Sequence, residues 1–303
     1  MNEKRTRIAI VGANGYTGGE LLRLLAAHPN VTVTAATSRS QAGQPLDAVF
    51  PALTGVDHLP AVFADLDASA VAEQADVVMT CLPHGDAQDW VARLIPAGRI
   101  VIDLSADYRY REAAIYEKAY QPHKHPDLAA RAVYGLPEWQ RDQIREADLI
   151  ANPGCYPTSV LLPLIPVARA SLIEPDIIVD SQSGVSGAGR TPKANLLHGE
   201  VSETLQAYGL PLHRHQSEMR WQLSDIGGFD TRLTFTPHLA PVNRGILSTI
   251  HVRPVEGVSS SDIRAAIASA YADSPFIHLL PDGRAPRTDA VRGSNSVHLQ
   301  VWP

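Results

Sequence analysis

Short apolar runs alternate with helix-like segments through the first half of the chain. The runs are rich in β-branched residues, as buried strands are, while the segments between them place apolar residues at helical spacing. This alternation is typical of a parallel, doubly wound sheet with helices on both faces. The predicted strands are Arg7–Val11, Val31–Ala36, Asp76–Cys81 and Arg99–Asp103, and the predicted helices are Glu20–Ala27, Ser69–Ala75 and Ala87–Leu94.

The pattern changes in the second half, where the predicted strands are longer and alternate in polarity. A buried helix is predicted over Ser159–Ile165, and a later one over Ser260–Ala272 with its start at Ser261-Asp262. These features predict an α/β chain in which a Rossmann-like parallel-sheet domain (residues 1–150) precedes an α+β domain with a mixed or antiparallel sheet (residues 151–303). The predicted strands of the second domain are Ile177–Asp180, Arg232–Thr236 and Ile246–Val252.

Composition narrows the class of protein. A length of 303 residues favours two domains, and a net charge of −6 argues against a nucleic-acid partner. No run approaches the roughly 20 apolar residues of a membrane span, and the N-terminus lacks the apolar core of a signal peptide. Two cysteines in a chain of this length do not form a secreted disulfide framework. We therefore expect a cytoplasmic protein with no membrane partner.

A glycine-rich turn follows the first strand. Gly12, Gly15 and Gly18 stand at G-x-x-G-x-x-G spacing, directly before a predicted helix. Glycines let a pyrophosphate approach the backbone, and a helix N-terminus offers free N–H groups. Thr17 and Glu20 are spaced as a capping box, which places the helix start there. The turn predicts nucleotide binding, with a purely structural turn as the alternative.

The end of the second strand bears on cofactor choice. An NAD site usually offers a carboxylate to the ribose there, but this chain has Ser38 and Arg39. A hydroxyl and a guanidinium donate to a 2′-phosphate, which a carboxylate would repel. The pair favours NADP as the cofactor. The alternative is that Arg39 is an ordinary solvated loop residue.

Cys155 stands in the stretch N-P-G-C-Y-P-T, immediately before the predicted apolar helix. A helix N-terminus lowers the pKa of a thiol and favours the reactive thiolate. In a chain that binds NADP, such a thiol indicates a thioester intermediate that is reduced by hydride. The alternative is a buried structural cysteine, which is also what we expect of Cys81 at the end of a strand.

Two polar loops, Leu82–Gly85 and Leu104–Arg109, follow predicted strands of the first domain and are candidate walls of the site, since ligands of such folds lie beyond the strand ends. His123-Lys124-His125 has no further ligand at metal-binding spacing and lies between prolines, so we predict a solvated loop and no metal site.

Eight motifs in order give the chain a resemblance to the N-acetyl-gamma-glutamyl-phosphate reductase family, which is related to aspartate-semialdehyde dehydrogenase. The resemblance covers nearly the whole chain, and the order of the motifs is more specific than any one of them. They are G-A-N-G-Y-T-G-G-E, L-P-H-G, D-L-S-A-D-Y-R, Y-G-L-P-E, N-P-G-C-Y-P-T, S-G-V-S-G-A-G-R, H-R-H and R-G-I-L.

The resemblance implies an NADP-dependent reduction of N-acetylglutamyl 5-phosphate to the semialdehyde and phosphate in arginine biosynthesis, with no metal. It implies that Cys155 is the nucleophile and that the acid/base lies in the H-R-H motif, where His213 is favoured and His215 is kept beside it. Anion contacts are expected from Arg109, Arg190 and Arg214. The expected cofactor contacts are Gly12, Asn14, Gly15, Tyr16, Thr17, Gly18, Ser38, Arg39, Ser186 and Gly187.

Alternatives stay open at this stage. A sister family reduces a carrier-linked aminoadipyl phosphate in lysine synthesis, but its cysteine loop resembles G-A-G-C-N-A-T more than N-P-G-C-Y-P-T. The sequence also lacks the D-N-L-x-K-G-x-x-G helix with which the family normally ends, so the other hypothesis is a silent NADP-binding protein. Related enzymes associate through the second domain, so a homodimer or homotetramer is expected.

Overall fold

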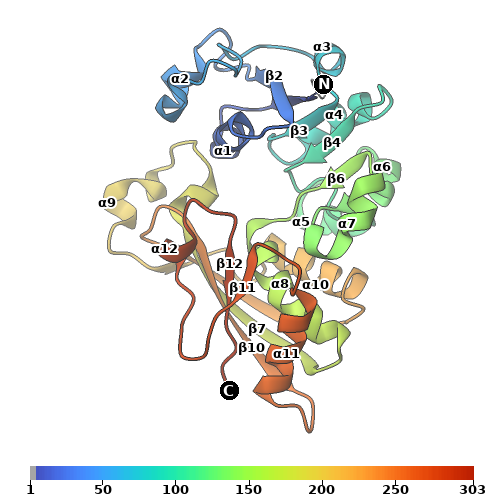
Figure 1. The fold of residues 1–303 in the computed structure, drawn as a ribbon, viewed down its shortest axis with the longest axis vertical. Helices are drawn as coiled ribbons and strands as arrows, with labels where there is room; N and C mark the ends of the chain where they lie inside the picture. Colours follow the sequence, from blue (N-terminus) through green and yellow to red (C-terminus); the bar gives the residue numbers. More distant parts are fainter. Residues whose placement is uncertain (1–4) are drawn as a thin grey trace. The chain divides into compact units, whose positions relative to one another are not determined.

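The computed structural model describes residues 5–303. The chain folds into two compact units, the first ending at Pro153 and the second beginning at Gly154 (Figure 1). The predicted boundary at residues 150 and 151 falls inside a strand that belongs to the sheet of the first unit.

The first unit is built on a six-stranded sheet in the order β2-β1-β3-β4-β6-β5, and every neighbouring pair is parallel. This confirms the predicted doubly wound sheet. The strands are β1 (Thr6–Val11), β2 (Val31–Thr37), β3 (Val77–Thr80), β4 (Ile100–Asp103), β5 (Val133–Tyr134) and β6 (Leu149–Ala151). The helices are α1 (Tyr16–Ala26), α2 (Leu46–Val49), α3 (Ala68–Gln74), α4 (Asp86–Leu94), α5 (Ala113–Ala119), α6 (Pro126–Arg131) and α7 (Pro137–Glu146), with a 3₁₀ turn at Pro51–Leu53.

Strand β1 shows how this sheet buries both faces. Because side chains alternate along a strand, Ile10 enters one apolar cluster with Leu22 of α1, while Ala9 and Val11 enter another with residues of α3 and α4. The side chains of Ala9, Ile10 and Val11 are each at most 1% exposed. The continuous apolar run in the sequence reflects this burial on two sides.

The start of α1 differs from the prediction. The helix begins at Tyr16 with Gly15 as its N-cap, and no side chain caps it. The predicted capping box of Thr17 and Glu20 is wrong, because Glu20 pairs with Arg23 one turn further along the helix instead. The first N–H groups of α1 are therefore left without a side-chain acceptor from the capping residue.

The loop after β4 is buried rather than open. Asp103 is fully buried and accepts hydrogen bonds from the hydroxyls of Thr80 and Ser105, both at 2.6 Å. Burial raises the pKa of Asp103 to about 6 against the opposing effect of these bonds. The Asp107 carboxylate accepts the N–H of Gly85 at 2.8 Å. The two loops that were predicted to form walls of the site are thus hydrogen-bonded to each other, and most residues of the second loop are buried.

The predicted solvated loop at residues 123–125 is wrong for its first residue. His123 is only 8% exposed, and its Nε2 lies 2.8 Å from the carbonyl oxygen of Asp107. Its ring packs edge-on against Tyr108 and Tyr116. Lys124 does face outward, where it forms an ion pair with Asp89.

The second unit is built on a mixed four-stranded sheet in the order β10-β7-β9-β8, as the sequence predicts. Strand β7 is parallel to β9 and antiparallel to β10, and β8 is antiparallel to β9. The strands are β7 (Ile173–Gly184), β8 (Gln206–Ala207), β9 (Arg232–Ala240) and β10 (Ile246–Pro254), and a separate parallel pair joins β11 (Ile277–Leu279) to β12 (Val297–Leu299).

Two longer helices, α8 (Cys155–Arg169) and α10 (Arg214–Asp225), pack against this sheet, and a third, α11 (Ser260–Ala270), packs against α8. Ser259 caps α11 in a capping box with Asp262, so the helix starts slightly before the predicted Ser261-Asp262. Short helical turns occupy α9 (His198–Val201), α12 (Thr288–Val291), Val185–Ala188 and Ala194–Leu196. None of the helices between residues 5 and 303 combines the length and apolar composition that a bilayer-spanning helix requires.

Candidate active site

Cys155 is the first residue of α8 and is exposed. Gly154 is the N-cap, and the Thr158 hydroxyl donates to the Gly154 carbonyl at 2.9 Å. Pro157 fits this position, since a first-turn N–H has no acceptor within the helix. Ten side chains of α8 are buried, including Val160 and Leu161, so packing holds the helix in place. The fold therefore places the thiol at the N-terminal end of a rigid helix, as the sequence predicts.

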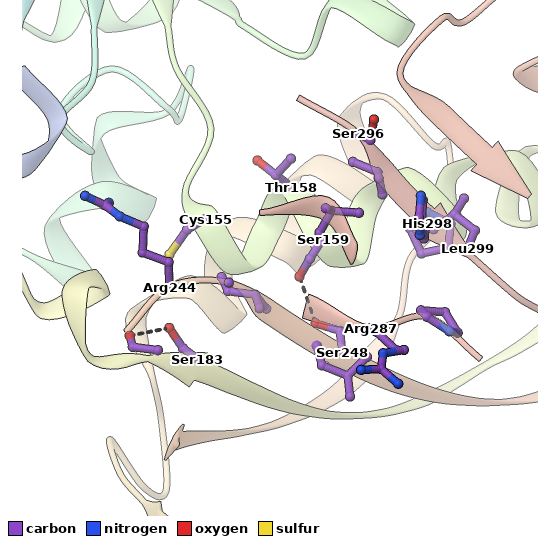
Figure 2. A pocket seen from close by; sticks show the side chains of 18 of the residues that line it. Cys155, Thr158, Ser159, Ser183, Arg244, Ser248, Arg287, Ser296, His298 and Leu299 are labelled. Carbon is purple, nitrogen blue, oxygen red and sulfur yellow. Dashed lines mark hydrogen bonds between the residues drawn. The ribbon is translucent and has the colours of Figure 1, made fainter. Parts of the chain in front are cut away.

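Two cavities of the second unit share Cys155 in their walls. The larger holds about 540 Å³ and runs along α8 and β10 toward β12. Figure 2 shows Cys155 and Arg244 at one end of it, and Arg287 with His298 at the other. The smaller holds about 360 Å³ and is lined by Lys193, Arg214 and both histidines of the H-R-H motif, among others.

The walls of both cavities carry positive charge. Arg244 and Arg287 line the larger, where Arg287 is ion-paired with Asp289, and Lys193 and Arg214 line the smaller; no Asp or Glu lies among the described residues of either wall. Such walls suit an anionic ligand, because cationic side chains make strong hydrogen bonds to carboxylate and phosphate oxygens.

His213 is the N-cap of α10, and its Nδ1 accepts the backbone N–H of His215 at 3.2 Å. The neutral ring therefore carries its proton on Nε2. Its ring packs edge-on against Tyr156, Tyr208 and Phe235. Burial, with a smaller contribution from Arg214, lowers the pKa of His213 to about 4. At neutral pH the imidazole is thus an uncharged hydrogen-bond donor.

The titration of His213 is testable. The histidine is expected to titrate near pH 4, against 6.5 for the free side chain. Because burial favours the neutral form, the folded state binds fewer protons than the unfolded state between these values. Stability contributed by this group is present above pH 6.5 and is lost as pH falls through 4. Imidazole NMR shifts, assigned with a His213→Gln variant, measure this, and a midpoint at 6 or above would contradict it.

The other residues predicted in the H-R-H region also line the smaller cavity. His215 is 8% exposed and packs edge-on against Tyr156, while Arg214 is exposed. Tyr208 was not singled out from the sequence, yet its hydroxyl lies 2.9 Å from that of Tyr156 and its ring lines the same cavity. Burial raises the pKa of both tyrosines, so both hydroxyls keep their protons.

Glu218 is a further residue that the sequence interpretation missed. Its side chain is fully buried, and its Oε1 accepts the N–H of Gly154 at 2.8 Å. A signal was present in the sequence, because the buried face of α10 repeats at helical spacing and includes a carboxylate. The buried positions of this helix are His215, Glu218, Met219, Gln222 and Leu223.

One part of the glycine-rich loop after β7 lines the larger cavity, and another part lies on the surface. Ser186 and Gly187 line the larger cavity together with Cys155, although the sequence prediction assigned them to the cofactor. Arg190 is exposed and lines neither cavity. Arg109 belongs to the first unit, is only 6% exposed, and donates to the carbonyls of Asn152 at 2.8 Å and Leu104 at 3.2 Å. Its guanidinium thus ties the ends of β4 and β6 together.

A third cavity, of about 580 Å³, lies in the first unit beside the glycine-rich turn. Gly12, Asn14, Ser38 and Arg39 line it, four of the residues predicted to contact the cofactor. The Asn14 amide lies 3.3 Å from the Ser40 hydroxyl and joins the two loops. Tyr16, Thr17 and Gly18 open α1 directly after this turn.

The backbone of the turn explains its glycines. Gly12 has φ of +79°, and a Cβ there would lie 2.8 Å from the Cys81 carbonyl oxygen. A Cβ on Gly18 would lie 2.3 Å from the Ala13 carbonyl oxygen. Gly15 is different, because a Cβ there would meet no protein atom within 4 Å. The fold alone does not require glycine at residue 15, so the space above it is free for a ligand.

Within residues 5–303, no three His, Cys, Asp or Glu side chains gather closely enough to hold a metal ion.

Comparisons with known proteins agree with this architecture. Residues 7–147 match the semialdehyde dehydrogenase NAD binding domain, and residues 155–302 match the semialdehyde dehydrogenase dimerisation domain. The N-acetyl-gamma-glutamyl-phosphate reductase of Citrifermentans bemidjiense is 49% identical over 97% of this chain and 85% of its own length. A probable chloroplastic enzyme of the same name from Arabidopsis thaliana is 45% identical over 99% of this chain and 75% of its own.

Solved structures share the fold at lower identity. Aspartate semialdehyde dehydrogenase II from Vibrio cholerae superposes with a TM-score of 0.72 at 18% identity, covering 98% of this chain and 88% of its own. The Candida albicans aspartate semialdehyde dehydrogenase, solved with NADP, superposes with a TM-score of 0.70 at 16% identity, covering 95% of this chain and 86% of its own. The chain thus belongs to the semialdehyde dehydrogenase family, on the branch of the N-acetyl-gamma-glutamyl-phosphate reductases.

Proposed function

We propose that this protein reduces N-acetyl-gamma-glutamyl phosphate to the semialdehyde with NADPH and releases phosphate, through a thioester on Cys155. One observation carries the proposal: an exposed thiol begins a buried helix, in cavities whose charged wall residues are cationic. An acyl phosphate with a carboxylate is an anion at both ends, and such walls match it.

The proposed chemistry begins at the Cys155 sulfur. The thiol gives its proton to a neighbouring base, and the sulfur then attacks the acyl carbon. A carbon–sulfur bond forms, the bond from the acyl carbon to the phosphate oxygen breaks, and phosphate leaves with the electron pair. The thioester is held at the start of α8. When bound, the nicotinamide cofactor supplies a hydride to the acyl carbon; the carbon–sulfur bond then breaks, the aldehyde leaves and the Cys155 sulfur keeps the electron pair.

The two histidines are suited to different parts of this chemistry. His213 is neutral and bears its proton on Nε2, so it is suited to donate a hydrogen bond to the acyl oxygen. His215, which lines the same cavity as Cys155, is then the proposed carrier of the thiol proton. Arg214 and Lys193 are the proposed contacts for phosphate, and the exposed Arg190 is a further anion contact at the rim.

The first unit is proposed to hold NADP at the turn before α1. Gly15 leaves open space beside the N-terminal end of this helix, which favours a pyrophosphate. Ser38, Arg39 and the Ser40 hydroxyl stand together on the cavity wall at the end of β2. Arg39 is exposed and makes no hydrogen bond or ion pair with any described residue, so its guanidinium is available to a 2′-phosphate.

The assignment of Arg39 gives a prediction about cofactor choice. Replacing Arg39 with alanine removes a charge-assisted contact of about 1.5–3 kcal/mol, so the KM for NADPH is expected to rise roughly 10- to 100-fold. The KM for NADH, which lacks the 2′-phosphate, should change little. Arg93→Ala, which removes another cation from the same cavity, is the matched control. Equal losses with both cofactors in Arg39→Ala would contradict the assignment.

We also propose that the protein acts in the cytoplasm as a homo-oligomer, a dimer or a tetramer. The match of residues 155–302 to a dimerisation domain supports the homo-oligomer.

The proposed activity is tested in the reverse direction. The purified chain is mixed with NADP, inorganic phosphate and N-acetylglutamate semialdehyde, and reduction of the cofactor is followed by absorbance. Phosphate-dependent reduction is expected. The aminoadipate-derived semialdehyde on its carrier protein is the comparison substrate, and faster turnover of that compound would favour the lysine branch instead. NADP binding without turnover of either would indicate a silent binding protein.

A further inference from the structure

Glu218 lies directly beneath the turn that presents Cys155. Its side chain is completely buried, and its Oε1 accepts the N–H of Gly154 at 2.8 Å. Gly154 is the N-cap of α8 and Cys155 is the next residue. A carboxylate therefore sits at the N-terminal end of the helix that carries the thiol.

Two negative groups then share one helix end. A helix N-terminus stabilises a nearby anion, and this favours the Cys155 thiolate. The two anions also repel each other, which favours the protonated thiol. A buried carboxylate is weakly screened by solvent, so its influence on the thiol exceeds that of an exposed one.

The other charged residues that share a cavity wall with Cys155 are cationic: Lys193, Arg214, Arg244 and Arg287, the last of which is ion-paired with Asp289. The further titratable side chains of these walls are Tyr156, Tyr208, His213, His215 and His298. The arginines and the lysine favour the thiolate, and no described wall residue is acidic. Glu218 is thus the carboxylate that opposes them from behind the turn.

The same carboxylate also connects two elements of the site. Glu218 lies on the buried face of α10, one turn after His215, and α10 begins beside the His213 cap. Its bond to Gly154 fixes the start of α8 relative to the start of α10. The thiol and both histidines are therefore held in fixed positions relative to one another.

We propose that Glu218 is a positioning residue for Cys155, whose buried carboxylate holds the turn and keeps the thiol from ionising too readily. This inference rests on the proposed role of Cys155 as nucleophile. A thiolate loses intrinsic nucleophilicity as its pKa falls, so a moderated proton affinity keeps the sulfur reactive toward an acyl carbon.

The test is the pH dependence of thiol alkylation by iodoacetamide, with the modified residue identified by peptide mass spectrometry. Burial raises the pKa of Cys81 to about 12, so alkylation below pH 9 reports Cys155. Glu218→Gln keeps the volume and an acceptor oxygen but removes the charge. Its profile is expected to move toward lower pH by about one unit. Asp225→Asn, which removes an exposed carboxylate from the same helix, should match the parent.

A Glu218→Gln profile that coincides with the parent, or moves toward higher pH, would overturn the proposal. Should this variant not fold, Glu218→Asp keeps the charge and is expected to follow the parent, so a shift of about one pH unit toward lower pH there would contradict a charge effect. Alkylation needs neither substrate nor cofactor. If Cys155→Ala still turned over while the Glu218→Gln profile shifted, the proposed thioester route would fail, and only the effect of the Glu218 charge on the Cys155 thiol would stand.

Discussion

Cys155→Ala is expected to lower kcat/KM for the reduction by at least roughly 10⁴-fold, because loss of a nucleophile removes the covalent route altogether. The side chain is exposed, so the free energy of unfolding should change by no more than about 0.5 kcal/mol. NADP affinity should also remain unchanged, since the glycine-rich turn and its cavity belong to the first unit. Steady-state kinetics, thermal unfolding and NADP titration together separate loss of chemistry from loss of fold.

The control is the other thiol. Cys81 packs against an apolar cluster of the first unit, and burial raises its pKa to about 12. It cannot supply a thiolate at neutral pH, so Cys81→Ala should retain turnover. A Cys155→Ala enzyme as active as its parent would refute the role of this thiol.

Gly15→Ala is expected to separate NADP binding from folding. A methyl group at residue 15 would meet no protein atom within 4 Å, and the backbone there has φ −79° and ψ 173°, which alanine adopts freely. Unfolding should therefore match the parent. The same methyl group would occupy the space we assign to the pyrophosphate, so NADP affinity should fall at least about tenfold, or roughly 1.4 kcal/mol.

Gly18→Ala is the matched comparison. Its Cβ would lie 2.3 Å from the Ala13 carbonyl oxygen, so the backbone must move, at a typical cost of about 1–3 kcal/mol in stability. Calorimetric titration with NADP and thermal unfolding of both variants measure the contrast. Unchanged NADP affinity in Gly15→Ala would place the cofactor elsewhere.

Much of the architecture could be predicted because it depends on local patterns. Strand β1 is apolar from Ile8 to Val11 since both its faces are buried there. Along β7 only one face is buried, so Ile177 and Val179 are covered while Ile178 between them is exposed. Cys155 could be placed at a helix start because Gly154 and a following apolar run mark that start. These signals lie within a few residues of one another and need no knowledge of the rest of the fold.

The hydrogen-bond and packing partners of polar side chains could not be predicted in the same way. The anion contact of Arg109 stays a prediction, but nothing in the sequence indicates the backbone carbonyls at two strand ends that accept its N–H groups. His123 was expected in solvent, but it packs between two tyrosines. Glu218 reaches a glycine 64 residues away. In each case at least one partner lies outside the local sequence pattern, namely Asn152 for Arg109, Tyr108 for His123 and Gly154 for Glu218, and only the folded structure brings the two together.

The most direct test of the central claim is to trap the acyl group on the protein. The chain is mixed with N-acetylglutamyl phosphate in the absence of NADPH, quenched in acid, digested, and the peptides are weighed by mass spectrometry. We predict an N-acetylglutamyl adduct on the peptide that contains Cys155, absent from Cys155→Ala and discharged when NADPH is added before the quench. An enzyme that turns over yet shows no adduct on that peptide would contradict the thioester route.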